Sequence, residues 1–279
     1  MVPGRSGILV VGTGGIGLSV ARRLGHGQLV ILADYSEKAL EFAANDLRDS
    51  GNEVDTQTVD VSKYESVENL AKFASEKCRL QTVVNTAGIS PAMGTARQIY
   101  EVDLLGTANI IDAFVKVMPR DSSLTCVASI AGHMAQKGIS PEFEKHLATA
   151  PKEKLLSHEA IDMNGSPGAA YGIAKWGNIV RAQASVRLGG KNGVRINTVS
   201  PGITSTAMIR KELASDAGVW IRKSIKESPI PRLCSPDETA ALVAFLAGNE
   251  ASFITGADFV IDGGVNAASR FSDVIPDMV

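Results

Sequence analysis

Cysteine, excess charge of one sign and long hydrophobic runs are all scarce in this sequence. Its 279 residues include only three cysteines, Cys78, Cys126 and Cys234, which stand far apart. They indicate reduced thiols in a cytoplasmic protein, without a disulfide framework or metal-ligand spacing. The formal net charge of −2 gives no positive excess for binding nucleic acid. The first apolar stretch, Ile8 to Val11, soon meets glycines and resembles neither a signal peptide nor a membrane-spanning helix. We therefore expect a soluble cytoplasmic protein with no metal, nucleic acid or membrane partner.

Short apolar runs alternate with helix-like segments along most of the chain. This alternation is typical of a parallel sheet covered by helices on both faces. Two helix starts carry capping-box signatures, one at Ser62 with Glu65 and one at Ser235 with Glu238. The expected strands are Gly7 to Val11, Leu29 to Ala33, Val54 to Val59, Leu80 to Asn85, Leu124 to Ala128, Val194 to Val199 and Asp258 to Ile261. The sequence predicts a single α/β domain over residues 1–279, with a doubly wound sheet of seven parallel strands.

One segment interrupts this alternation, at about residues 133–166. It is charged and helix-prone, and Pro141, Pro151 and Pro167 punctuate it. Because proline fits the first turn of a helix and breaks its interior, two short helices are expected, Glu142 to Ala150 and Lys152 to Met163. The segment is either a solvated surface excursion or a functional element, such as a lid or a subunit contact.

A glycine-rich turn follows the first expected strand. Glycines allow a tight turn and a close approach to a pyrophosphate, and the helix that starts near Ile16 offers free N–H groups and a positive dipole end. The pattern G-x-G-x-x-G, placed between a strand and a helix, predicts a dinucleotide site. Its residues are Gly12, Thr13, Gly14, Gly15, Ile16 and Gly17.

Asp34 ends the second expected strand. A carboxylate there can accept hydrogen bonds from a ribose 2′-hydroxyl and would repel a 2′-phosphate. Neither the glycine turn nor Tyr35 provides an Arg or Lys to offset that repulsion, so we expect NAD as the cofactor in preference to NADP. Alternatively, Asp34 is an N-terminal helix charge ahead of Ser36.

Tyr171 and Lys175 share one helical face because they are four residues apart. A cation at that range favours the phenolate, and this would make a tyrosine with an ordinary pKa near ~10 useful as a proton donor or acceptor. With Ser129, at the end of the fifth apolar run, the pair could form a proton-relay site for interconverting a carbonyl and an alcohol. The alternative is a surface tyrosine stacked on a lysine stem.

Taken in order, these motifs resemble the short-chain dehydrogenase/reductase family from the first strand to the C-terminus. Asp60-Val61 resembles its adenine contact, Asn85-Thr86-Ala87-Gly88 its N-N-A-G turn, and Ser129-Ile130-Ala131-Gly132 its catalytic-serine segment. Pro201-Gly202-Ile203 with Thr206 resembles the loop that holds the nicotinamide carboxamide, and Ile261-Asp262-Gly263-Gly264 the final strand and turn. The resemblance implies a Rossmann-like fold, a homo-oligomer, and a cofactor site that includes Asp60, Val61, Asn85, Ala87, Gly88, Pro201, Gly202, Ile203 and Thr206.

Two departures from the family pattern concern the glycine turn and the proton relay. The turn is one residue shorter between its first glycine and Gly15 than in T-G-x-x-x-G-x-G. Asp103 stands where the family usually has an Asn that orders a water linked to the Lys. A carboxylate there cannot donate unless protonated, and its charge would raise the pKa of Lys175. We therefore include Asp103 among the candidate catalytic residues, with Ser129, Tyr171 and Lys175.

The function that this resemblance implies is NAD-dependent hydride transfer between a secondary alcohol and a ketone. The stretch between Ser129 and Tyr171 is longer than in most members and is similar to that of the bacterial 3α-hydroxysteroid dehydrogenase/carbonyl reductase type, which implies a bulky, apolar, steroid-like substrate. Residues 207–231 would close over it, with Met208, Ile209, Leu213, Val219, Trp220 and Ile225 either forming an apolar pocket or packing on the core. The alternatives are a small alcohol, sugar or acyl-thioester carbonyl as substrate, or a catalytically weak dinucleotide-binding regulator.

Overall fold

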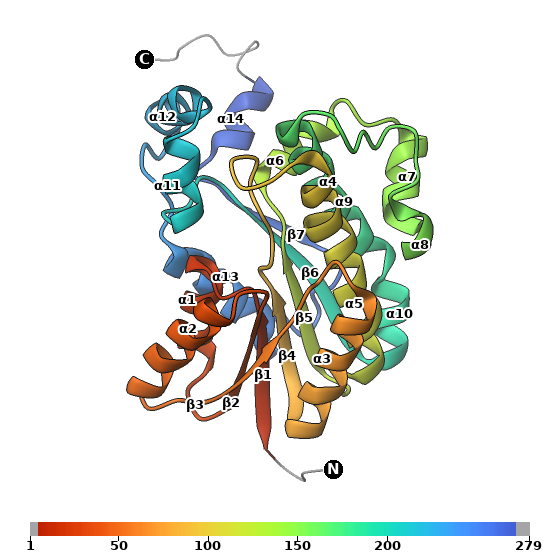
Figure 1. Ribbon diagram of the computed structural model, residues 1–279, viewed down its shortest axis with the longest axis vertical. Helices are drawn as coiled ribbons and strands as arrows, with labels where there is room; N and C mark the ends of the chain where they lie inside the picture. The colour runs from red at the N-terminus through yellow and green to blue at the C-terminus, as the bar shows by residue number, and fades with distance from the viewer. Residues whose placement is uncertain (1–4, 272–279) are drawn as a thin grey trace.

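Seven parallel strands form one sheet in the computed structural model, which describes residues 5–271 (Figure 1). Their spatial order is β3-β2-β1-β4-β5-β6-β7, so the chain order reverses between β1 and β4, as in doubly wound sheets. The strands are β1 (Ser6–Val11), β2 (Leu29–Asp34), β3 (Glu53–Thr58), β4 (Arg79–Asn85), β5 (Ser122–Val127), β6 (Val194–Pro201) and β7 (Asp258–Ile261). The predicted Rossmann-like sheet is confirmed, with small shifts at the strand ends.

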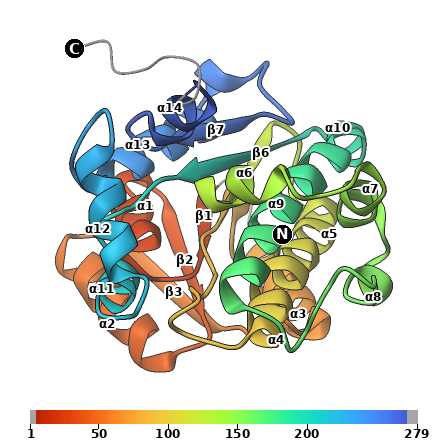
Figure 2. The ribbon, with the colours of Figure 1, turned by 90° about the horizontal axis from the view of Figure 1, so that it is seen from above.

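Helices cover both faces of the sheet, and each face has its own apolar core (Figures 1 and 2). One face is covered by α1 (Gly15–Leu24), α2 (Glu37–Asp49) and α13 (Pro236–Ala247), and the other by α3 (Tyr64–Lys77), α5 (Gly106–Val117) and α9 (Pro167–Ala184). Central strand side chains are buried on both faces, Leu9 and Val11 in one core and Ile8 and Val10 in the other. This accounts for the continuous apolar runs of the sequence. The shorter helical elements are α4 (Ala96–Ile99), η1 (Tyr100–Leu105, a π-helical turn), α6 (Ile130–Gln136), α7 (Pro141–Thr149), α8 (Lys152–Leu155), α10 (Val186–Asn192), α11 (Ala207–Leu213), α12 (Gly218–Glu227), η2 (Asn249–Ala251, a 3₁₀ turn) and α14 (Val265–Phe271).

The two predicted capping boxes have different outcomes. At α13 the prediction is confirmed, because the Ser235 side chain accepts from the helix backbone and Glu238 accepts from the Ser235 N–H. At α3 it is wrong, since the helix begins at Tyr64 without a side-chain cap. The Ser62 hydroxyl instead donates to Asp60 at 2.6 Å, and a local side-chain bond of this kind competes with helix capping.

The segment at residues 133–166 packs against the body of the molecule. Phe143, Leu147, Leu155 and Ile161 are buried in a third apolar cluster with residues of α4, α5 and α9, which is inconsistent with a solvated excursion. The segment and the pair α11 and α12 lie on opposite sides of the molecule (Figures 1 and 2).

The first predicted helix of this segment is found as α7, but the second is wrong beyond Leu155. After that residue, side chains bond to nearby backbone N–H groups: His158 Nδ1 accepts from Ala160, and Asp162 accepts from Asn164. Such local bonds stabilise turns at the expense of helix. The expected helix Lys152 to Met163 therefore ends one turn after it begins.

A buried arginine of α9, the helix that carries Tyr171, forms hydrogen bonds to α7. Arg181 is 6% exposed and donates to the backbone oxygens of Leu147 at 3.2 Å and Ala150 at 2.6 Å. These oxygens belong to the last turn and the C-cap of α7, where carbonyls have no partner within the helix. Arg181 thus caps the C-terminus of α7 by donating hydrogen bonds to two of its carbonyl oxygens.

Replacing Arg181 with Met is expected to lower the free energy of unfolding by about 2 kcal/mol, because two hydrogen bonds from a charged donor are lost and buried carbonyls are left unpaired. Urea denaturation measures the change. Arg187→Met, at an exposed position of α10, is the matched control and should change stability by less than ~0.5 kcal/mol. Equal stability of the Arg181 variant and the unmodified protein would refute this role.

The candidate closing segment contains α11 and α12. Of its apolar side chains, Val219 is 75% and Trp220 56% exposed, so these two do not pack on the core. They lie on the solvent side of α12, whereas Ile221 faces inward and is buried. Within residues 5–271, no helix is both long and apolar enough to cross a membrane.

Candidate active site

The carboxyl ends of the parallel strands bring the predicted site residues to one edge of the sheet. Gly12 follows β1, Asn85 ends β4, Ser129 follows β5, and Pro201 ends β6. These four strands are neighbours in the sheet. In open parallel sheets, ligands bind outside the carboxyl ends, where the strand order reverses.

The glycine turn leaves the N-terminus of α1 open. Gly14 is the N-cap and contributes no side-chain bond, and a Cβ built on it would have open space around it. Gly12 has a φ of 90°, and a Cβ at Gly17 would lie 1.9 Å from the Gly12 carbonyl oxygen, so both positions require glycine. The one-residue-shorter turn thus still forms a helix start with free N–H groups, which suits a pyrophosphate.

Asp34 contacts both the glycine turn and the helix that follows it. Its Oδ2 accepts from the Thr13 N–H at 2.7 Å and the Thr13 hydroxyl at 2.9 Å, while Oδ1 accepts from the Ser36 N–H at 2.9 Å. The contact with Ser36 is the one expected of a charge ahead of a helix. Tyr35 beside it is 76% exposed. Asp34 therefore lies next to the turn that would hold a dinucleotide.

A threonine joins the ends of β1 and β4. The Thr86 hydroxyl lies 3.1 Å from the carbonyl oxygen of Val11 and 2.7 Å from that of Gly12, either of which can accept from it. A Cβ at Gly12 would be 2.7 Å from the backbone nitrogen of Ala87, so the two turns are in direct contact. Thr86 is a site residue that the motifs alone did not single out, although a hydroxyl side chain directly after a strand indicates such a role.

The remaining predicted cofactor residues line the same edge. Asn85 is buried, and its side chain donates to the Thr107 hydroxyl at 3.2 Å and accepts from the Ala87 N–H at 3.3 Å. The Val61 backbone oxygen accepts from the Asn109 side chain at 2.9 Å, next to Asp60 at the end of β3. These hydrogen bonds fix the positions of the turns at this edge of the sheet.

The segment after β6 lies against the glycine turn. The Gly202 N–H donates to the Ile261 oxygen at 2.9 Å, and the Ile203 oxygen accepts from Cys234. Thr206 caps α11, and its Cγ2 would lie 3.0 Å from a Cβ at Gly15. The Thr206 side chain therefore lies against the glycine turn at Gly15.

Tyr171, Lys175, Asp103 and Ser129 form one group. An interaction with the Ser129 side chain is one of the causes that lower the pKa of Tyr171, and the Lys175 Nζ lies 5.3 Å from the centroid of the Tyr171 ring. The four-residue spacing therefore correctly predicts that Lys175 lies beside the Tyr171 ring. Ser129 is the N-cap of α6 and also accepts from the Ala131 N–H, which fixes its position.

Asp103 forms a direct ion pair with Lys175. The Asp103 Oδ2 lies 3.0 Å from the Lys175 Nζ, and both side chains are buried. The carboxylate sits within the π-helical turn η1, a backbone form that is frequent at functional sites. A Cβ at Gly88 would be 2.8 Å from Asp103 Oδ2 and 3.1 Å from Lys175 Nζ, so Gly88 leaves room for the pair.

The charges of this group act on one another. Burial lowers the pKa of Lys175, but the Asp103 carboxylate and the Tyr171 phenol outweigh it, so the pKa of Lys175 is raised, as the sequence predicted. Burial raises the pKa of Tyr171; Lys175 opposes this, and Asp103 adds to it. The expectation that Lys175 lowers the pKa of Tyr171 holds for its own contribution, but the net direction is upward.

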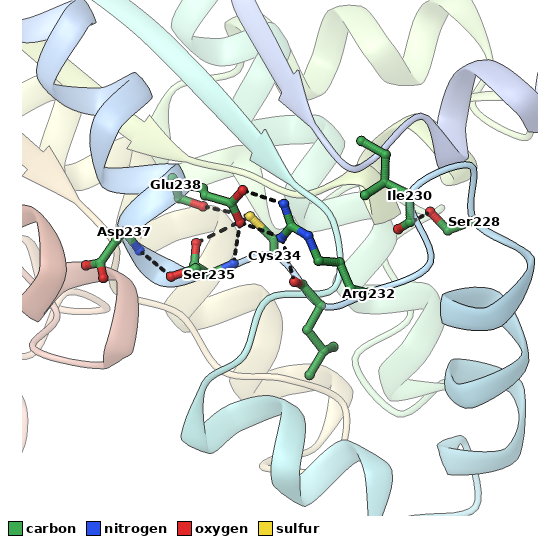
Figure 3. Close-up of polar contacts among 9 residues, drawn as sticks. Ser228, Ile230, Arg232, Cys234, Ser235, Asp237 and Glu238 are labelled. Atoms are coloured by element: carbon green, nitrogen blue, oxygen red, sulfur yellow. Dashed lines mark hydrogen bonds and ion pairs between the residues drawn. The ribbon is translucent and has the colours of Figure 1, made fainter.

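A separate cavity of about 120 Å³ lies behind the segment that follows β6. Ile203, Ile225, Ile230 and Ile261 give it apolar walls, and the ion pair between Arg232 and Glu238 lies at its edge (Figure 3). This volume is below the few hundred Å³ of sites for drug-sized ligands. Tyr171 is not among its lining residues, and Ile203 is the lining residue it shares with the predicted cofactor site.

Comparison with known proteins identifies the family. Residues 7–141 match the family model described as short chain dehydrogenase, and residues 155–266 match the model described as enoyl-(acyl carrier protein) reductase. The chain is 32% identical over 268 residues to short-chain dehydrogenase/reductase bsc3 of Alternaria brassicicola, covering 94% of this chain and 96% of that one. The chain belongs to the short-chain dehydrogenase/reductase family.

Other relatives of this short-chain dehydrogenase/reductase include the 3-alpha-hydroxysteroid dehydrogenase/carbonyl reductase of Comamonas testosteroni, which is 28% identical over 249 residues, 84% of this chain and 92% of the relative. A structure of a variant of actinorhodin polyketide ketoreductase with NADPH has the same fold, with a TM-score of 0.72 at 23% identity, over 94% of this chain and 97% of that one. Members of the family bind a nicotinamide dinucleotide and act on small molecules. The two matched ranges leave out residues 142–154, which include most of α7.

Proposed function

We propose that this protein is an NAD-dependent oxidoreductase that interconverts a secondary alcohol and a ketone, with residues 1–279 as one catalytic domain. The observation that carries the proposal is the grouping of Ser129, Tyr171 and Lys175 at the sheet edge that also presents the open N-terminus of α1. A bulky apolar substrate is supported by the inserted segment and by the hydroxysteroid activity for which the Comamonas relative is named.

The residues at this edge fit a dinucleotide. Gly12 to Gly17 would face the pyrophosphate, Asp34 the ribose, and Asp60 and Val61 the adenine. Asn85, Ala87, Gly88 and the segment Pro201 to Thr206 would surround the nicotinamide end, with Tyr171 and Lys175 at the adjoining ribose. When bound, the dinucleotide supplies or accepts the hydride.

Residues of the chain itself transfer the proton. Tyr171 donates a proton to the carbonyl oxygen during reduction and removes it during oxidation, because this proton must move with the hydride. The Ser129 hydroxyl donates a hydrogen bond to the same oxygen, where negative charge develops. Lys175 stabilises the phenolate, and Asp103 keeps Lys175 protonated at neutral pH.

A panel of ketones and secondary alcohols, followed by NADH absorbance with NADPH in parallel, tests the proposal. It should range from small alcohols through sugars and acyl thioesters to hydroxysteroids. Turnover of at least one ketone is expected, and a panel without any turnover, combined with tight dinucleotide binding, would favour the regulator instead.

NADH should support turnover at least ~10-fold better than NADPH, because Asp34 would repel a 2′-phosphate. The double variant Asp34→Ser with Tyr35→Arg should reverse this preference, since it removes the carboxylate and adds a cation at an exposed position. The ratio of kcat/KM values for the two cofactors is the measurement. The single variant Tyr35→Phe is the control, and a wild-type preference for NADPH would contradict the assignment.

We also propose that the protein is cytoplasmic and forms a homo-oligomer, as is common in the family. The inserted segment, packed on α9, would make the interface differ from that of members without it. Light scattering of the purified protein measures the oligomeric state, and a monomer at micromolar concentration would contradict this proposal.

A further inference from the structure

Glu212 is a buried acidic residue that the proposed reaction does not use. It lies on α11 and is 8% exposed. Its Oε1 accepts a hydrogen bond of 2.7 Å from the backbone N–H of Ala92. Glutamates are seldom this buried without a cationic partner, and the amide that holds this one is neutral.

The segment that carries Ala92 also contacts the proton-relay group. Its Ile89 N–H donates to Asp103 Oδ1 at 2.9 Å, and Gly88 lies against both Asp103 and Lys175. Figure 2 shows α11 beside this segment, which leads from β4 into α4. Glu212 is therefore hydrogen-bonded to the same loop that contacts Asp103 and Lys175 beside Tyr171.

The other end of α11 lies at the cofactor edge, where Thr206 adjoins Gly15. The helix thus joins the glycine turn to the loop at Ala92. The Glu212 carboxylate is therefore held at the loop that borders the proton-relay group.

Near Tyr171, negatively charged side chains outnumber positively charged ones. Lys175 is paired with Asp103 at 3.0 Å, and among residues 5–271 no lysine or arginine forms an ion pair with Glu212. The charge of Glu212 also acts on the phenol. It raises the pKa of Tyr171, as burial and Asp103 do. A substrate carboxylate near the reacting carbon would be repelled there.

We infer that Glu212 is a specificity-determining residue that makes the enzyme favour neutral ketones and alcohols over carboxylates of the same shape. Its hydrogen bond to Ala92 holds the charge in place. This inference rests on the proposed oxidoreductase function and adds to it the charge class of the substrate.

The test compares three 3-oxo or 2-oxo esters with their acids: methyl acetoacetate with acetoacetate, methyl benzoylacetate with benzoylacetate, and methyl benzoylformate with benzoylformate. The unmodified enzyme should show higher kcat/KM for each ester that it reduces. In Glu212→Gln the amide oxygen can still accept from Ala92, so the connection stays while the charge is lost. The ratio of ester to acid should fall about 10-fold.

Glu227→Gln is the matched control, because Glu227 lies on α12 of the same segment and its side chain is 63% exposed. It should leave the ratio unchanged, since exposed charges are screened. An equal fall in both variants, or no fall in Glu212→Gln, would overturn the inference. If the Gln variant does not fold, Glu212→Met removes the same charge without a buried amide and is read in the same way. Failure of the unmodified enzyme to turn over any member of the wider panel of ketones and alcohols would instead count against the oxidoreductase function itself.

Discussion

Tyr171→Phe is expected to lower kcat by at least ~10³-fold, because general acid–base catalysis by a positioned side chain contributes up to about 10⁴. The substitution removes one oxygen atom from a partly buried side chain, so the fold and the packing of α9 should persist. The dinucleotide-binding turn is made by other elements, so NADH affinity should stay within a few-fold of the unmodified enzyme. Steady-state kinetics and fluorescence titration with NADH separate these two quantities.

Tyr64→Phe is the matched control for this prediction. The Tyr64 hydroxyl accepts a hydrogen bond from Lys116 at 3.0 Å, and this contact is on the exposed surface of α3 and α5. Its loss should leave kcat unchanged. Turnover retained by the Tyr171 variant would rule out the phenol as the proton donor and leave the Ser129 hydroxyl as the next candidate.

Asp103→Asn should change both stability and the pH profile. The variant leaves the Lys175 ammonium buried without its carboxylate, and breaking a buried ion pair on one side costs about 3 kcal/mol. The amide can still accept from the Ile89 N–H, so the turn η1 should persist. Chemical denaturation measures the loss. Asp55→Asn is the control, because the Asp55–Lys77 pair is largely exposed and should contribute less than ~1 kcal/mol.

The kinetic consequence of Asp103→Asn has a defined sign. Alcohol oxidation requires the Tyr171 phenolate, so the rate rises with pH through the pKa of that group. Asp103 is one of the causes that raise this pKa; without its charge, and with Lys175 still protonated, the pKa of Tyr171 falls. The rising limb of the oxidation profile should therefore move to lower pH in the variant. An unshifted limb, or a shift to higher pH, would contradict the role given to Asp103.

The sequence predicts the sheet and the grouping of the candidate site residues at one edge for one physical reason. Strands buried on both faces read as uninterrupted apolar runs, and the turns at their carboxyl ends carry glycine, Asn85 or Ser129. Because parallel strands end at the same edge, the order of the runs is enough to bring these residues together. The i to i+4 spacing likewise places Lys175 against Tyr171.

Other features depend on contacts that leave no local pattern. The capping role of Ser62 fails because Asp60 binds its hydroxyl, and the helix after Lys152 ends early because His158 and Asp162 bind the backbone. The net rise in the pKa of Tyr171 results from burial, which the spacing of Lys175 does not encode. The contact between Glu212 and Ala92 joins residues that are far apart in the chain, so only the folded structure reveals it.

The transfer of deuterium to a ketone from NADH that carries deuterium at both C4 positions of the nicotinamide ring tests the central claim most directly. The ketone is the best substrate of the panel, and mass spectrometry of the alcohol product is the measurement. We predict one deuterium on the carbinol carbon with the unmodified enzyme, and no labelled product above background with Tyr171→Phe at equal NADH occupancy. An alcohol that forms without the label, or equal labelling by the Tyr171 variant, would contradict the account.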